Sequence, residues 1–403
     1  MYTCPGEAYP IDRAVHLGRM AAFYAKCREC PHRTDTGTLP PETLDQLAAV
    51  WKQSDFGVRF TAEGVTGIYR HQLTVADVRQ LAAAFAETLP RNAMPTVLLA
   101  GDDRPFVPSL IAAAAEGLRW AGCRVIDVGI SSAGCTAWAA AELQAQGAIL
   151  IGNPSDEPRT IGLKFWGAGG VPLSDPGGLT RLRKALVLGI NRPTRSYGPL
   201  ERRTIEPDYL ATLADRFYAL RPLRVVLDTG CRSLVRGLRQ LSGRVACEIY
   251  CVQDHPPAAI AHSPPLPRSA GRTGALGRLV HQRHAHFGLW IDGDGEACQA
   301  VDERGQPVAP EALVALLAEA LEVVQVTGAE IVAPATREAV HAAMLRERST
   351  LLADTGSRIW FAEPHPAPDA LRLVATLLTA LSRSDRPMSE ALAASLEPAA
   401  SSE

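Results

Sequence analysis

Apolar residues along the chain alternate between short runs and longer segments with helical spacing. After Thr74, apolar residues recur at helical intervals, and Asp77 stands three residues later, where a capping box needs it. Short apolar, β-branched runs at 96–100 and 124–130 predict two strands, and the segment 109–121 between them has a helical pattern. Strands and helices that alternate in this way predict parallel strands covered by helices.

The same alternation continues along the chain and divides it into three units. A connector rich in Pro and Arg at 191–206 separates the first two. The predicted fold class is α/β, with three consecutive domains that hold mixed or parallel sheets. The predicted parts are an N-terminal appendage at 1–50, domains at 51–191, 207–306 and 309–396, and a tail at 397–403. Further strands are predicted at 148–151, 224–228, 245–251, 287–291, 330–333 and 359–361, and further helices at 138–146, 311–322, 337–345 and 369–382.

The composition is that of a globular chain without a dominant charge. Its 403 residues are 47% hydrophobic and 21% charged, which is enough for several packed domains. Because the 41 basic residues are nearly balanced in number by 43 acidic ones, we expect no binding to nucleic acid or to a membrane surface. The first residues lack the apolar stretch of a signal peptide, and no apolar run is long enough to predict a spanning helix. We therefore expect a cytoplasmic protein.

The N-terminal appendage is rich in Cys, His, Pro and Arg. Cys27 and Cys30 form a C-x-x-C step that His32 follows, and Cys4 lies upstream. These four residues together would complete a tetrahedral zinc site that could hold a small segment together. The alternative is a reduced, exposed loop without metal, because one C-x-x-C step is a weak signal. The nine cysteines of the chain are scattered and odd in number, so no disulfide framework is expected.

An acidic turn directly follows the predicted strand at 287–291. Its sequence is DGDGE, and it offers Asp292, Asp294 and Glu296. Alternating carboxylates in a tight turn can point three oxygens inward, which suits a hard divalent cation such as Mg²⁺. The alternative is an ordinary glycine-rich turn whose carboxylates are solvated.

Several motifs occur in the order in which the phosphosugar mutases carry them. Residues 101–104, GDDR, resemble the family's G-x-D-x-R loop. The acidic turn resembles its D-G-D-x-D-R metal loop, with Glu296 in place of the third Asp and Ala297 in place of the Arg. Over residues 52–395 the chain resembles the alpha-D-phosphohexomutase superfamily, the phosphoglucomutases and phosphomannomutases. The resemblance implies phosphohexomutase-type domains with a serine loop, a metal loop and a sugar loop, a hexose phosphate as substrate, and Mg²⁺ held by the acidic turn.

The family's nucleophile is a serine in the loop T-A-S-H-N-P. The corresponding segment of this chain, 153–158, reads NPSDEP. A one-residue deletion after Pro158 brings Ser155 to the serine position, whereas an alignment without a gap brings Pro154 there. Ser155 is the preferred candidate, because it keeps the spacing S-x-x-P.

The resemblance implies transfer of a phosphoryl group from phosphorylated Ser155 to the hexose phosphate, and its return after the sugar has reoriented. Arg104 would stabilise the charge, as would Lys164, which matches the lysine of the family's G-x-K motif. Asp156 and Glu157 follow the serine, however, and add negative charge where a phosphate of about −1.5 to −2 would lie. We therefore expect an activity that is weakened or altered.

The family's third domain reads sugar hydroxyls with the motif G-E-x-S-G-H. Residues 353–358, ADTGSR, stand in its place, and they make Asp354, Ser357 and Arg358 candidate substrate-binding residues. Family members continue into a fourth domain that grips the second phosphate, and this chain is expected to lack it. Fewer groups would then position the substrate, which again favours weak turnover. The second hypothesis is a non-catalytic pseudoenzyme with a regulatory or scaffolding role.

Overall fold

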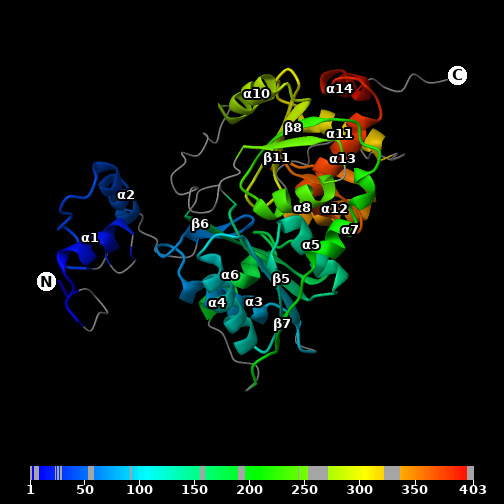
Figure 1. Ribbon diagram of the computed structural model, residues 1–403. Helices are drawn as coiled ribbons and strands as arrows, with labels where there is room; N and C mark the ends of the chain where they lie inside the picture. The colour runs from blue at the N-terminus through cyan, green and yellow to red at the C-terminus, as the bar shows by residue number, and fades with distance from the viewer. Residues whose placement is uncertain are drawn as a thin grey trace.

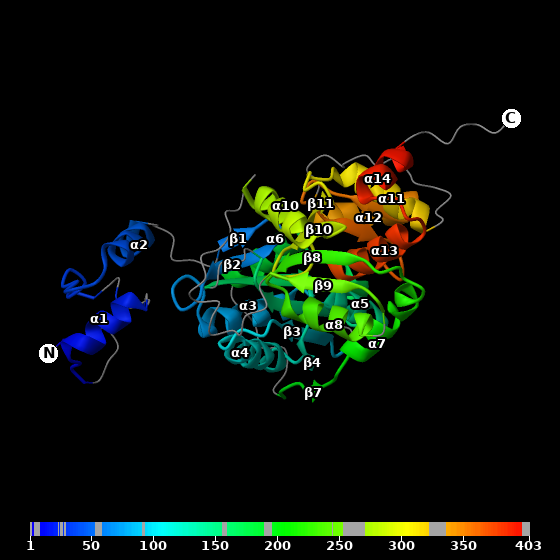
Figure 2. The ribbon, with the colours of Figure 1, turned by 45° about the horizontal axis from the view of Figure 1, so that its top comes forward.

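The computed structural model shows three sheets with their helices in one body (Figure 1). The predicted α/β class is thereby confirmed. Two helices near the N-terminus, α1 (Arg13–Ala21) and α2 (Pro41–Lys52), lie apart from this body in both views (Figures 1 and 2). The structure describes residues 2–3, 9–22, 24, 27, 30–52, 59–90, 93–154, 159–188, 196–243, 245–252, 271–321 and 336–396. Within these ranges no helix is long and apolar enough to cross a membrane.

The first sheet has seven strands in the order β1-β2-β6-β5-β3-β4-β7. The strands β5, β3, β4 and β7 run parallel to one another, whereas β6, β2 and β1 are added in antiparallel pairings. β5 is buried at every position, as expected for a central strand covered on both faces. The strands are β1 (Arg59–Thr61), β2 (Gly64–Ile68), β3 (Thr96–Gly101), β4 (Arg124–Ile130), β5 (Gly147–Gly152), β6 (Thr160–Trp166) and β7 (Leu200–Arg202).

Helices α3 (Val75–Glu87), α4 (Val107–Trp120) and α6 (Gly178–Leu188) cover one face of this sheet. The predicted capping box begins α3: the Thr74 side chain accepts from the backbone N–H of Asp77, and the Asp77 carboxylate accepts from that of Thr74. Helix α5 (Ala133–Glu142) covers the opposite face, where it joins a core shared with the rest of the body.

The second and third sheets are smaller. The second has the order β11-β10-β8-β9, in which β10 is parallel to β8 and antiparallel to β11. The three described strands of the third sheet pair antiparallel. The strand predicted at 330–333 lies outside the described residues. The strands are β8 (Arg224–Thr229), β9 (Glu248–Cys251), β10 (Phe287–Ile291), β11 (Cys298–Asp302), β12 (Leu351–Ala353), β13 (Ile359–Phe361) and β14 (Ala367–Pro368). Their helices are α7 (Glu206–Ala211), α8 (Arg232–Ser242), α10 (Gly271–Arg283), α11 (Pro310–Ala320), α12 (Arg337–Glu347), α13 (Ala370–Ser382) and α14 (Met388–Leu396).

One hydrophobic core joins all three sheets. It includes Trp138 of α5, Leu227 of β8 and Leu377 of α13, all buried. The turn after β10 is attached to the same place, because the Asp294 carbonyl accepts from the Ala133 backbone N–H at 2.9 Å. The acidic turn after β10 therefore lies against the start of α5.

A glycine controls the packing of α3 against α4. A Cβ at Gly117 would overlap the backbone carbonyl of Arg79, so the two helices would have to separate. We predict that Gly117→Ala lowers the free energy of unfolding by about 1–3 kcal/mol despite the better helix propensity of alanine. Gly274→Ala in α10 is the control, since only Arg278 Nη1, at 3.9 Å, lies near its added Cβ. Urea unfolding should show G274A equal to or more stable than the wild type; equal stabilities of G117A and wild type would contradict the prediction.

Candidate functional site

Asp292 shapes the acidic turn between β10 and β11. Its Oδ1 atom accepts the backbone N–H groups of Glu296, at 2.7 Å, and Ala297, at 3.2 Å. Gly295 takes a positive φ of 77°, which a glycine adopts without strain. Burial, reinforced by the carboxylates of Asp294 and Glu296, raises the pKa of Asp292 to about 7 even though Lys164 opposes the rise. One oxygen of this candidate ligand is thus used within the turn itself.

The other two carboxylates of the turn share a lysine from the first sheet. Lys164, on β6, places its Nζ 2.8 Å from Asp294 Oδ2 and 2.6 Å from Glu296 Oε2. All three residues are at most 5% exposed. Burial acts to lower the pKa of Lys164, but Asp294, Glu296 and Asp292 together raise it above its ordinary value. The lysine therefore stays charged between the two carboxylates.

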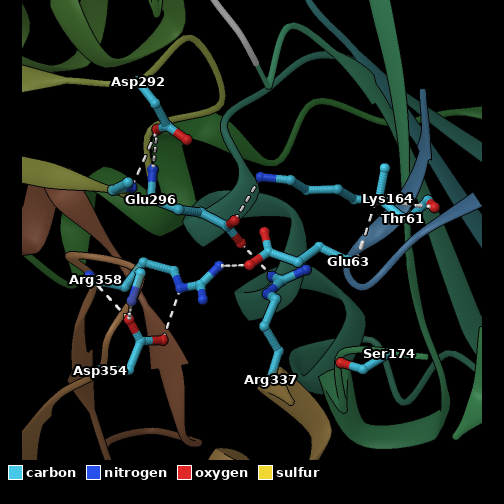
Figure 3. A network of polar contacts seen from close by, with 12 residues as sticks. Thr61, Glu63, Lys164, Ser174, Asp292, Glu296, Arg337, Asp354 and Arg358 are labelled. Atoms are coloured by element: carbon cyan, nitrogen blue, oxygen red, sulfur yellow. Dashed lines mark hydrogen bonds and ion pairs between the residues drawn. The ribbon is translucent and has the colours of Figure 1, made fainter. Parts of the chain in front are cut away.

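Two arginines of the third unit extend this network (Figure 3). Arg337, the first residue of α12, binds Glu296 Oε1 and is 1% exposed. Arg358 binds Glu63, which lies in the turn between β1 and β2. Burial opposes ionisation of Glu63, yet Arg358, Arg337 and Lys164 together lower the pKa of Glu63 to about 2. Ion pairs thus connect all three sheets.

The acidic turn lies against the base of the loop predicted to carry the nucleophile. A Cβ added to Gly152, the last residue of β5, would overlap Asp294 Oδ1. A side chain at this position would therefore displace the Asp294 carboxylate. Ser155 itself falls in 155–158, outside the described residues, and its role stays a prediction.

Arg104 holds both ends of that loop. Its guanidinium donates to the carbonyls of Gly152, at 2.7 Å, and Thr160, at 2.6 Å, and its Nε donates to Asp102 Oδ2 at 2.7 Å. The sequence predicted that Arg104 stabilises charge on the transferred group. Its contacts fix the two residues from which the loop departs, and a role of Arg104 in stabilising charge stays a prediction.

The carboxylate of Asp354 is used within its own loop. Oδ1 accepts the backbone N–H groups of Gly356, at 2.8 Å, and Arg358, at 3.2 Å. Oδ2 accepts Arg358 Nε at 2.7 Å and Trp360 Nε1 at 2.8 Å. Four donors occupy the acceptor sites of this carboxylate, and a contact of Asp354 with sugar hydroxyls stays a prediction. In this arrangement Asp354 organises the loop.

Backbone contacts join this loop to the acidic turn. Ala297 and Arg358 form an isolated antiparallel bridge, and the Cys298 N–H donates to the Ser357 carbonyl at 2.7 Å. We call the place where Gly152, the acidic turn 292–297 and the loop 353–358 meet the three-loop junction. A direct contact of Ser357 or Arg358 with substrate stays a prediction.

The fit of Mg²⁺ to the acidic turn can be judged from its donor atoms. Three carboxylates are suitable ligands by type. Here, however, Lys164 binds two of them and Arg337 binds the remaining oxygen of Glu296. Among the described residues no three or more His, Cys, Asp or Glu side chains are grouped so that they could hold a metal ion. The turn as arranged does not fit Mg²⁺, because protein cations already bind three of its carboxylate oxygens.

The predicted zinc site has no support. Cys27 and Cys30 are buried, and the His32 ring lies edge-on to Tyr2 with the ring centroids 5.3 Å apart. Cys4 lies outside the described residues. The alternative of an exposed loop does not describe these cysteines either, because Cys27 packs with Met20 and Leu47 in a small apolar cluster. A metal in the appendage stays a prediction.

Two residues of the buried ion-pair network could not be recognised as site residues from the sequence. Arg337 begins a predicted helix, where arginine normally faces solvent, and Glu63 lies in an ordinary turn. Only the packing of α12 and of the β1–β2 turn against the acidic turn brings them in. Glu338, next in α12, reinforces this packing, since its Oε2 accepts the backbone N–H of Gly178 at 2.9 Å.

Comparisons with known proteins agree with the motifs. Residues 57–180 match the family model of phosphoglucomutase/phosphomannomutase, alpha/beta/alpha domain I. A phosphoglucomutase/phosphomannomutase of Thermococcus kodakarensis is 28% identical over 280 residues, 66% of this chain and 59% of that protein. A phosphoglucosamine mutase of Synechococcus is 28% identical over 272 residues, 66% of this chain and 57% of that protein. Residues 57–180 thus resemble domain I of this family, and about two thirds of the chain is similar to phosphohexomutases.

Solved structures of phosphohexomutase type share the fold. A phosphoglucomutase/phosphomannomutase family protein of Burkholderia thailandensis matches with a TM-score of 0.69 and 22% identity, covering 82% of this chain and 78% of that one. A putative phosphomannomutase of Thermus thermophilus matches with a TM-score of 0.68 and 18% identity, covering 84% and 83%. The chain spans less than two thirds of the length of the curated phosphohexomutases given above.

Arg337 provides a test of the buried network. Its removal leaves one oxygen of the buried Glu296 without its cation, so Arg337→Met should lower the free energy of unfolding by about 3–5 kcal/mol. Arg346→Met, on the same helix, removes an arginine whose side chain is 72% exposed, and we expect a change within about 0.5 kcal/mol. Urea denaturation of both variants measures the difference. Equal losses would show that the network contributes no more than a surface pair.

Glu63 gives the network a dependence on pH. Its folded pKa of about 2 lies below the ordinary 4.5, so its ion pair contributes stability above pH 4.5 and loses it as the pH falls towards 2. The difference in the free energy of unfolding between the wild type and Glu63→Gln should therefore be constant above about pH 5 and shrink below pH 4.5. The control Glu116→Gln, which breaks the exposed pair with Arg79, should show a small difference throughout. A Glu63 difference that grows on acidification would refute this.

Proposed function

We propose that this protein binds a hexose phosphate at the three-loop junction. The observation that carries the proposal is the packing of Asp294 against Gly152. It supports a shared site, since the loop with Ser155 and the acidic turn are the segments that resemble the serine and metal loops of the superfamily. The bridge between Ala297 and Arg358 adds the segment that resembles the sugar loop.

The buried cations support a phosphorylated ligand. Arg337 Nε and Nη1 have no hydrogen-bond partner, although the guanidinium is buried. Such donors are poorly satisfied without a ligand and match the oxygens of a phosphate. The buried Trp166 ring lies 5.6 Å from Arg337 Cζ. A sugar phosphate would supply the negative charge and the acceptor oxygens that these donors lack.

We further propose that phosphoryl transfer through Ser155 is weakened or lost. Transfer depends mainly on positioning and on cations free to meet the developing charge. In this chain the turn that would hold Mg²⁺ is already paired with Lys164 and Arg337. The same pairing favours the second candidate, a pseudoenzyme that binds the sugar phosphate for a regulatory or scaffolding purpose.

We also propose a cytoplasmic location for this protein.

Calorimetric titration tests the binding, and a coupled assay tests the turnover. Glucose 1-phosphate, mannose 1-phosphate or glucosamine 1-phosphate should bind at one site per chain, whereas unphosphorylated glucose should bind at least tenfold more weakly. Ser155→Ala should keep the binding. Turnover that is present in the wild type and lost in Ser155→Ala would identify a mutase, and binding without turnover would identify a pseudoenzyme. Absence of binding by every hexose phosphate would overturn the proposal.

A further inference from the structure

The acidic turn contains a cation that belongs to the chain. We infer that the ammonium group of Lys164 replaces the divalent metal ion in this turn, so that the turn is held together without metal. The inference concerns the same place as the proposed function, but it does not require any sugar phosphate to bind. It rests on how each carboxylate oxygen of the turn is used.

The oxygens nearest to one another are bound by cations of the protein. Asp294 Oδ2 and Glu296 Oε2 both contact Lys164 Nζ, at 2.8 and 2.6 Å, and Glu296 Oε1 contacts Arg337. Asp292 Oδ1 accepts two backbone N–H groups of the turn. A magnesium ion requires near-octahedral oxygen ligands at about 2.0–2.1 Å. It would have to compete for two of these oxygens with a positive charge that is already in contact with them.

Lys164 lies on a strand that is paired on both sides. β6 lies inside the first sheet, between β2 and β5, and Lys164 pairs with Leu150 of β5. Next to it, a Cβ at Gly64 would overlap the carbonyl of Leu163, so β2 is packed tightly against this strand. A buried ammonium without its carboxylates is strongly unfavourable, and the reverse holds for the carboxylates. Lysine and turn therefore stabilise each other.

One carboxylate oxygen of the acidic turn is not bound by Lys164. Asp294 Oδ1 is buried and has no hydrogen-bond partner, and it faces Gly152. Once the ammonium is removed, this oxygen, Asp294 Oδ2 and Glu296 Oε2 would together recover negative charge that attracts a divalent cation, while Glu296 Oε1 stays bound to Arg337. Removal of Lys164 should therefore create a metal site that the wild type lacks.

Manganese binding tests the inference directly. Free Mn²⁺ is measured by electron paramagnetic resonance during titration of the full chain, without any sugar phosphate. The wild type should bind no stoichiometric Mn²⁺, and its melting temperature should be the same in Mg²⁺ and in EDTA. Lys164→Ala should bind one Mn²⁺ per chain at least tenfold more tightly than the wild type, and Mg²⁺ should raise its melting temperature. Lys164→Arg, which keeps the charge, should behave as the wild type does.

The control is Lys184→Ala, which removes an exposed lysine of α6 and should leave Mn²⁺ binding unchanged. Stoichiometric Mn²⁺ binding by the wild type would overturn the inference, even if every variant of Lys164 failed to fold. A folded Lys164→Ala that gains no Mn²⁺ site would overturn it as well. Because no sugar is present, failure here leaves the calorimetric result for hexose phosphates untouched.

Discussion

The contact of Lys164 with two carboxylates of the acidic turn is the interaction on which the rest of the site depends. It joins the first sheet to the second, and Arg337 joins the third unit to the same turn. Each of these groups is buried, so none of them is stable there without its partner. The arrangement of the three sheets therefore depends on the ion pairs of the acidic turn, and a change in either alters the other.

A buried network of this kind contributes specificity more than net stability. Hydrophobic residues of the same volume would often be equally stabilising, whereas loss of one partner leaves a costly buried charge. The network thus requires that three segments meet in one relative position, with Gly152 and the bridge between Ala297 and Arg358 allowing the close approach. That same position is where the superfamily resemblance locates the substrate. Here the chain uses its own side chains for much of the charge balance.

Secondary-structure elements that depend on neighbouring residues could be predicted from the sequence. The strands at 124–130, 287–291 and 359–361 have the predicted bounds, because each is a compact apolar run between polar residues. The capping box at Thr74 depends on two residues within one turn of helix. The acidic turn and the loop after β5 were identified from motifs, and the structure brings them into contact.

The contacts inside the site could not be predicted in the same way. Lys164 and Glu296 are far apart in the chain, and nothing in either segment indicates that they pair. Asp354 was assigned to the sugar because carboxylates accept hydroxyl groups, but whether its oxygens are free depends on four donors that only the folded loop supplies. The contacts of Arg104 could not be predicted either, since its acceptors are carbonyls at the two ends of one loop. Residue type indicates a chemistry, and tertiary packing decides whether it is used.

We infer that the Lys164 ammonium group occupies the acidic turn in place of a divalent metal ion. The most direct measurement is a crystal structure grown in millimolar MnCl₂, with anomalous diffraction recorded at the manganese edge. We predict no anomalous peak among Asp292, Asp294 and Glu296, with Lys164 Nζ in hydrogen-bond contact with the last two. A peak at that position, with the lysine turned away from both carboxylates, would contradict it.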